Sequence, residues 1–202
     1  MALPFFLLTV VLISLSGVMM PGPVFAVTLS KGYESPVAGI GVALGHGIVE
    51  IPLIIIIYFG FARFFQLGLV KTIVGVAGGL VLIYMGFGMF RTRHEIDGKA
   101  QIFSQGSIIA GFLTTASNAY FFLWWTTIGA ALMTRAITFG VAGILLFVVV
   151  HWLSDLTWCS FVSLTVYKTK HLWSNKLHRI LSGLCGGILI GFGGWFIFSV
   201  FI

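Results

Sequence analysis

The chain has 202 residues, of which 59% are hydrophobic and only 8% are charged, and its mean hydropathy is +1.11. Soluble domains carry about 25% charged residues, so this composition excludes a soluble protein and predicts an integral membrane protein. The formal net charge of +6 does not call for a nucleic-acid partner, because basic loops that face anionic lipid account for it.

Six apolar segments are long enough to cross a bilayer, which takes about 20 residues of helix. They lie at residues 3–30, 36–61, 68–90, 106–132, 138–166 and 178–201. Because almost every residue belongs to a span, we expect one all-α transmembrane domain over residues 1–202, with a linker at about 93–103 between halves of about 1–92 and 104–202. The first segment lacks a basic start and a small-residue cleavage site, so we expect the mature protein to keep it.

The first span contains the helix breakers Pro21, Gly22 and Pro23. The two prolines remove two backbone donors, and the residue before each proline is pushed out of helical geometry. Unwound backbone at membrane depth is tolerated where it lines a cavity, and the half-helix that starts near Pro23 would point its positive end at an anion. We therefore predict a broken helix on a substrate pathway, with a plain proline kink as the alternative.

Polar residues also interrupt the fourth span, where Ser117 and Asn118 follow two threonines. Ala119 neither removes a donor nor blocks the helix, so the sequence leaves open whether this span bends or breaks. The Asn118 amide can donate and accept toward a ligand, and we take Ser117 and Asn118 as candidate pathway residues. The alternative is a hydrogen bond that only packs two membrane helices together.

Histidine and an acid lie four residues apart twice, His46 with Glu50 in the second span and His151 with Asp155 in the fifth. Residues at this spacing share one face of a helix. Each ionisable residue in a membrane span is costly, by about 3 kcal/mol at the helix centre, and such residues usually serve a function. We expect both pairs to face inward and to converge near the bilayer centre. The alternative is two intrahelical pairs that only fix the packing.

The features of the first three spans recur in the same order in the last three. The third and sixth spans share the glycine pattern GxxGG, the second and fifth carry the His and acid pairs, and the first and fourth are interrupted. Halves with an odd number of spans enter the membrane from opposite sides, so the sequence predicts an inverted 3+3 repeat of the kind that secondary transporters have. The glycines also permit close contact between protomers, so a homo-oligomer stays open.

Basic residues in the loops predict the orientation in the cytoplasmic membrane, because they accumulate on the inner side. Eight fall on the side reached after spans one, three and five, against three on the other side, so both termini are expected outside. The eight are Lys31, Arg91, Arg93, Lys99, Lys168, Lys170, Lys176 and Arg179, and the three are Arg63, Lys71 and Arg135.

The segment MPGPVFAVTLSKGYESPVAGIGVALGHG, together with the glycine-rich third span, resembles the lysine and threonine exporters of the LysE type. The resemblance extends over essentially the whole chain. It implies export of amino acids or related small metabolites, driven by the proton gradient. It also implies Pro21, Gly22 and Pro23 as pathway residues and Asn118 as the counterpart of the family's second Asn-Pro, whose proline is replaced here by Ala119.

Two transport functions fit the four ionisable residues. In proton-coupled export, Glu50 and Asp155 alternate between a proton and the substrate's ammonium group, while His46 and His151, which titrate near neutral pH, tune them. In divalent-metal export, the same four side chains form a ligand set suited to zinc, manganese or iron. We favour the organic solute, because the cysteines are not spaced as ligands and the linker has no histidine-rich tract.

An enzyme is the least favoured reading, because no serine or cysteine nucleophile accompanies the histidines. No cofactor is expected. The partners that we expect are a small-molecule substrate, protons and the lipid bilayer.

Overall fold

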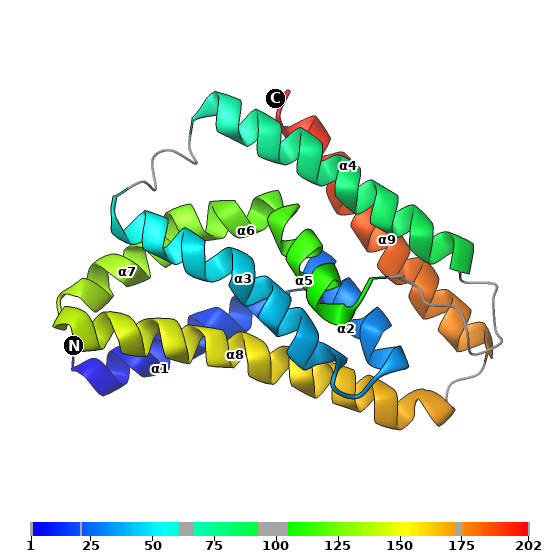
Figure 1. The fold of residues 1–202 in the computed structure, drawn as a ribbon, viewed down its shortest axis with the longest axis horizontal. Coiled ribbons are helices and arrows are strands. Elements are labelled where there is room, and N and C mark those ends of the chain that lie inside the picture. Colours follow the sequence, from blue (N-terminus) through cyan, green and yellow to red (C-terminus); the bar gives the residue numbers. More distant parts are fainter. Residues whose placement is uncertain (1, 21, 61–66, 93–104, 173–174, 202) are drawn as a thin grey trace.

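The computed structural model describes residues 2–20, 22–60, 67–92, 105–172 and 175–201, and everything regular in these ranges is helical (Figure 1). Helices α4 (Gly68–Thr92) and α9 (Asn175–Ser199) lie side by side as one pair. The other helices form a second group, in which α3 (Ala38–Tyr58) and α8 (Gly140–Thr169) pack against each other. The short η3 helix, Lys170–Leu172, continues α8.

The predicted interruption of the first span is present. Helix α1 (Leu3–Val18) ends before the breakers, α2 (Pro23–Glu34) begins at the last of them, and the two helices meet at 76°. Gly22 is extended, with φ −151° and ψ −171°, and Pro23 opens α2, a position where its fixed φ suits the helix and its missing N–H costs nothing. Pro21 lies outside the described residues.

The fourth predicted span is also broken, although it lacks the proline. Helix α5 (Ser107–Ala116) ends at Ser117, and α6 (Ala119–Trp124) continues through the π-helix η2 (Trp125–Gly129) into α7 (Ala130–Ile137). Asn118 leaves helical geometry, and its Oδ1 accepts hydrogen bonds from the backbone N–H groups of Tyr120 and Phe121. A capping side chain therefore ends one helix and starts the next where the sequence left the outcome open.

Three helices among the described residues are long and apolar enough to cross a membrane. They are α3, the Gly68–Gly88 part of α4, and Gly140–Leu172, and the bent pair α1 and α2 would make a fourth span. Helix α5 and the Gly183–Ser199 part of α9 are shorter apolar helices. The structure thus supports three to four of the six predicted spans by length and composition.

Glycines bring α4 and α9 into close contact. A Cβ on Gly79 would lie 2.5 Å from the carbonyl oxygen of Gly193, and a Cβ on Gly193 would lie 2.5 Å from that of Gly79. The same approach recurs at Gly86, whose Cβ would lie 2.7 Å from the carbonyl oxygen of Gly186. Small residues let membrane helices approach to backbone contact, where dispersion attraction is largest.

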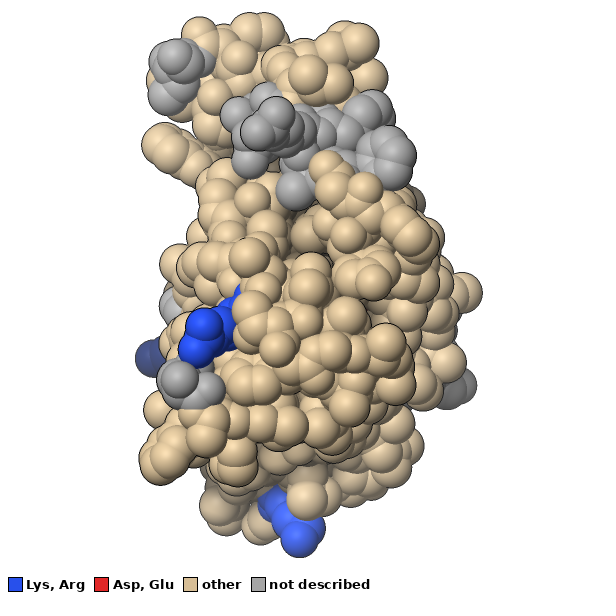
Figure 2. Space-filling model, turned by 90° about the vertical axis from the view of Figure 1, so that its left-hand side faces the viewer, with Lys and Arg blue, Asp and Glu red and all other residues tan. Residues whose placement is uncertain are grey.

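The surface is what a lipid-facing protein requires. In the view of Figure 2, Lys and Arg show at only a few points among the described residues and no Asp or Glu is visible. Lys31, which we expected in a loop, instead lies inside α2, with its side chain 4% exposed and its Nζ 2.8 Å from Glu34 Oε2. Its ammonium is neutralised within the protein, so it is not a free loop base of the kind on which the orientation rule depends.

Candidate functional site

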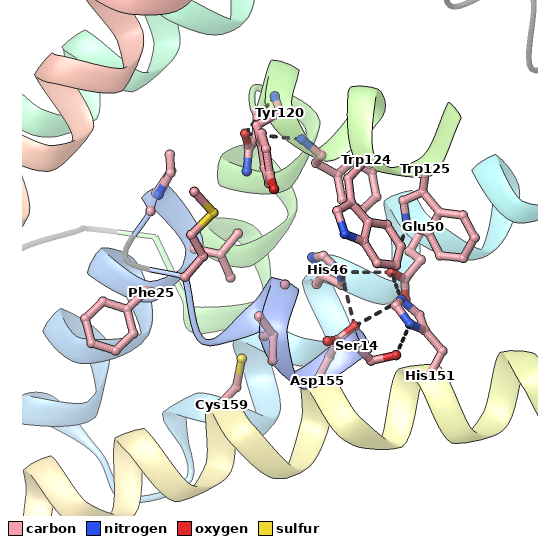
Figure 3. Close-up of a pocket in the computed structure, with 18 of the residues that line it drawn as sticks. Ser14, Phe25, His46, Glu50, Tyr120, Trp124, Trp125, His151, Asp155 and Cys159 are labelled. Atoms are coloured by element: carbon pink, nitrogen blue, oxygen red, sulfur yellow. Dashed lines mark hydrogen bonds and ion pairs between the residues drawn. The ribbon is translucent and has the colours of Figure 1, made fainter. Parts of the chain in front are cut away.

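The structure brings the two His and acid pairs together. His46 and Glu50 lie one turn apart on α3, and His151 and Asp155 lie one turn apart on α8. Each imidazole Nε2 is 3.0 Å from Glu50 Oε1 and 3.6 Å from Asp155 Oδ2. The four side chains therefore form a closed ring in which histidines and acids alternate (Figure 3). We call it the His–acid ring.

Three further side chains hold this ring, and the sequence reasoning gave none of them a role in it. Ser14 Oγ of α1 lies 2.7 Å from His151 Nδ1, and Thr115 Oγ1 of α5 lies 2.9 Å from His46 Nδ1. Trp125 Nε1 donates a 3.2 Å hydrogen bond to Glu50 Oε1. Each histidine is thus bonded at Nδ1 by a hydroxyl from a neighbouring helix. A Ser or Trp in an apolar span is a common residue, so the sequence offered no specific signal for Ser14 or Trp125.

The hydrogen-bond directions locate a proton on His151. Ser14 Oγ is also 2.7 Å from the carbonyl oxygen of Val10, which can only accept, so the single hydroxyl hydrogen goes to Val10. The bond to His151 then requires Nδ1–H as the donor. At its other nitrogen, His151 faces Glu50 Oε1, which already accepts from the Trp125 indole. We assign His151 as an imidazolium with hydrogen on both nitrogens, paired with an ionised Glu50, because this state is compatible with all of these distances.

His46 is constrained less. The Thr115 hydroxyl has no other hydrogen bond in the described part of the chain, so it can either donate to His46 Nδ1 or accept from it. His46 can therefore change its protonation state without losing this contact. The two histidines of the ring differ in this respect, although their positions in the sequence look equivalent.

Aromatic rings enclose the His–acid ring. Trp124 stacks on the His151 imidazole at 5.4 Å between centroids, and Trp125 meets it edge-on at 5.0 Å. Phe121 approaches His46 edge-on at 5.1 Å. Glu50 is only 1% exposed. Charge interactions are strong in such a low-dielectric setting, and an unpaired charge there is costly.

A cavity of about 100 Å³ joins the ring to both helix breaks. All four ring residues line it, and so do Gly22, Pro23 and Asn118. The predicted pathway residue Ser117 does not belong to the lining. It is buried, and its carbonyl oxygen lies against Gly78 of α4. The remaining described lining residues are Ser14, Gly17, Val18, Met20, Val24, Phe25, Tyr120, Phe121, Trp124, Trp125, Cys159 and Phe192.

The two helix starts on this cavity differ in one property. At α6 the Asn118 side chain already occupies the first-turn N–H groups. At α2 the capping residue is Gly22, and no described side chain accepts from the first turn. The partial positive charge of a helix start favours an anion. Only the start of α2 is therefore open to an anionic group of a ligand.

One fully buried oxygen of the ring makes no hydrogen bond among the described residues. Glu50 Oε2 is buried and makes no hydrogen bond within the described residues, while Oε1 takes all the donors. An unsatisfied buried carboxylate oxygen is costly. A donor group on a ligand would satisfy it.

The ring also contains a possible metal-binding set. One ligand atom each from His46, Glu50 and Asp155 lie within 4.8 Å of one another. A metal would need the lone pair of His46 Nε2, which in this conformation faces Glu50 Oε1 at hydrogen-bonding distance. The geometry therefore suits shared hydrogens directly, and a metal only after the ring rearranges.

Comparison with known proteins places the chain in a family. The "Putative amino acid efflux protein YcgF" of Bacillus subtilis (strain 168) is 28% identical over 188 residues, which cover 87% of each chain. No solved structure matches this chain. The model of the LysE type translocators matches residues 15–199, a range that contains the His–acid ring and both helix breaks. The chain belongs to the LysE type translocator family, whose members are transporters and not enzymes.

Proposed function

We propose that this multi-pass membrane translocator exports a zwitterionic amino acid, or a similar small metabolite, from the cytoplasm in exchange for protons. One observation carries the proposal. The open helix start of α2 lies on the same cavity as Glu50 and Asp155, and Glu50 Oε2 has no hydrogen-bond partner among the described residues. The Bacillus subtilis relative is named for amino acid efflux, and this name supports the same class of substrate.

The binding mode follows from the two charged groups of an amino acid. Its carboxylate would lie at the first turn of α2, beside Gly22 and Pro23, where the helix dipole is favourable. Its ammonium group would donate to Glu50 Oε2, and Asp155 lies across the ring from Glu50. Discontinuous helices bind substrate carboxylates in this way in other secondary transporters.

Coupling follows from competition for the same carboxylates. Glu50 can bind either a proton or the substrate's ammonium group. A bound proton removes the negative charge that attracts the ammonium, and a bound ammonium occupies the carboxylate that would take the proton. We assign His46 as the residue that passes the proton to and from Glu50, because its Nε2 lies 3.0 Å from Glu50 Oε1 and Thr115 accommodates both protonation states of the imidazole. His151 keeps its hydrogen toward Ser14 and serves to hold Glu50 in place. A proton that enters the ring would then release the substrate on the outer side.

Alternating access would come from six spans in two inverted halves. Three features support this architecture. Each half supplies one histidine and one acid to the ring, the first and fourth spans are both broken, and Gly79 and Gly193 make a reciprocal contact between α4 and α9. The two halves would rock against each other around the fixed ring.

We place both termini outside the cytoplasmic membrane. The C-terminal ends of α2 and α8 lie together, because Lys170 Nζ, just after α8, donates a 3.0 Å hydrogen bond to the Tyr33 carbonyl oxygen of α2. Lys168 lies two residues before Lys170 in the chain, so this end of the molecule carries basic residues. Basic residues favour the cytoplasmic side, so this end would face inward. A reporter fused to either terminus should be active outside the cell. A reporter that is active only in the cytoplasm would reverse the orientation.

The test is efflux from proteoliposomes loaded with labelled amino acid, driven by a proton gradient. Glu50→Gln removes the charge but keeps the shape, and we expect it to abolish gradient-driven efflux while the protein still folds. Glu95→Gln is the control, because Glu95 belongs to the linker that the sequence predicts between the two halves, and it should keep its efflux. Unchanged efflux in Glu50→Gln would refute the role of the ring.

Divalent-metal export remains the second candidate, because His46, Glu50 and Asp155 bring three ligand atoms together. It predicts saturable binding of zinc or manganese to the purified protein, lost when His46→Ala and His151→Ala are combined. Calorimetry without any binding heat in the unmodified protein would remove this candidate.

A further inference from the structure

The cavity has two polar ends, the start of α2 and the His–acid ring, and the walls between them have a different character. Among its described lining residues, Glu50 and Asp155 are the acids, and no lysine or arginine is present. Both acids contact the same two imidazole nitrogens, so they lie at one point of the cavity. The rest of the wall is largely apolar and aromatic, with the side chains of Phe25, Tyr120, Phe121, Trp124 and Phe192.

This arrangement provides partners for one ammonium and one carboxylate. A basic amino acid has a second ammonium, four methylene groups away from Cα. When its α-carboxylate and α-ammonium occupy the two polar ends, that second charge falls among aromatic rings with no acid beside it. Burying an unpaired charge is far more costly than a cation–π contact can offset. The face of Trp124 is moreover already stacked on His151.

An acidic amino acid meets the same difficulty with the opposite sign. Its second carboxylate would need a cation, and the described lining residues include no cationic side chain apart from the two ring histidines, which pair with Glu50 and Asp155. A side chain without charge or hydrogen-bonding groups fits the wall directly, and its burial is favourable.

We propose that the cavity selects neutral amino acids with apolar side chains, such as leucine and valine, over basic and acidic ones. This inference rests on the proposed function, because it names the substrate class for the same site. The wall decides selectivity, while the two polar ends only recognise the features that all amino acids share.

The first test compares substrates in one protein. Proteoliposomes that contain the full chain are loaded with labelled leucine, valine, threonine, lysine or glutamate, and efflux under a proton gradient is measured for each. We expect leucine and valine to leave at least about tenfold faster than lysine and glutamate. Threonine serves as the uncharged polar reference in this panel.

The outcomes separate the two proposals. Efflux of lysine or glutamate as fast as that of leucine would overturn the selectivity inference and leave amino acid export standing. Absence of efflux for every amino acid in the panel would overturn the proposed function itself.

The second test changes the wall. Tyr120 lines the cavity in the first turn of α6 and is 36% exposed, and an acid in a first turn is favoured by the helix dipole. Tyr120→Glu should raise the ratio of lysine to leucine efflux about tenfold or more, because the added carboxylate pairs the second ammonium. Tyr120→Gln has the same size without the charge and should leave the ratio unchanged. Equal ratios in both variants would overturn the inference, and retained leucine efflux shows that the variants fold.

Discussion

Removing the Ser14 hydroxyl tests the hydrogen-bond assignment of the ring. Ser14 is 1% exposed, and its Oγ lies 2.7 Å from both Val10 O and His151 Nδ1. In Ser14→Ala the carbonyl of Val10 keeps its helical backbone bond, so this loss costs little. The imidazolium of His151, however, loses the acceptor of its Nδ1–H. A hydrogen bond to a charged group contributes about 1.5–3 kcal/mol, so we expect Ser14→Ala to lower the free energy of unfolding by about 2 kcal/mol.

The assay is denaturant-induced unfolding of the purified protein in detergent micelles. Ser16→Ala is the matched control, because Ser16 lies on the same helix, is exposed and bonds only the carbonyl oxygen of Ile13 among the described residues. It should change stability by less than about 0.5 kcal/mol. A double-mutant cycle with His151→Phe isolates the Ser14–His151 term, expected at about 2 kcal/mol. A coupling below about 0.5 kcal/mol, or equal losses in the two serine variants, would refute the assignment of the proton.

Two further substitutions test the packing and the ring. Gly79→Ala should lower the free energy of unfolding by about 1–3 kcal/mol, because the added Cβ has no room. Gly187→Ala is the control, because nothing lies within 4 Å of its Cβ, and it should be neutral or stabilise the helix by up to about 1 kcal/mol. Equal effects of the two substitutions in the same unfolding assay would contradict the packing of α4 on α9. Trp125→Phe removes the indole donor to Glu50 and should slow efflux roughly tenfold, while Trp195→Phe, which alters a ring that is 58% exposed, should not. Equal rates in these two variants would show that the indole hydrogen bond does not matter for transport.

Local features of the sequence were enough to predict a good part of the molecule. Composition gives an all-helical membrane protein, because apolar segments in lipid must satisfy their backbone hydrogen bonds internally. Pro23 and Gly22 break the first span through backbone geometry alone. The spacing of four residues puts His46 beside Glu50 on one helix face. Each of these results depends on neighbours in the chain, which the sequence displays directly.

The partners across helices could not be predicted in this way. His151 reaches Glu50 across 101 residues, Ser14 reaches His151 across 137, and Trp125 reaches Glu50 across 75. No periodicity specifies which serine or tryptophan of an apolar span will face a given histidine, because this depends on how the helices cross and rotate. The break at Asn118 was likewise undecided until its side chain was seen to cap α6.

The sequence by itself therefore determined the membrane class, the helical segments and the two polar faces, since hydrophobic length, proline geometry and helical periodicity are properties of consecutive residues. Only the tertiary structure decided which atoms of the two expected faces meet in one ring, that Ser14 lies against His151 Nδ1, and that α2 offers the open helix start. The physical reason is that a hydrogen bond acts over about 3 Å, so the partners of a buried charge are fixed by the packing of helices that are distant in the chain.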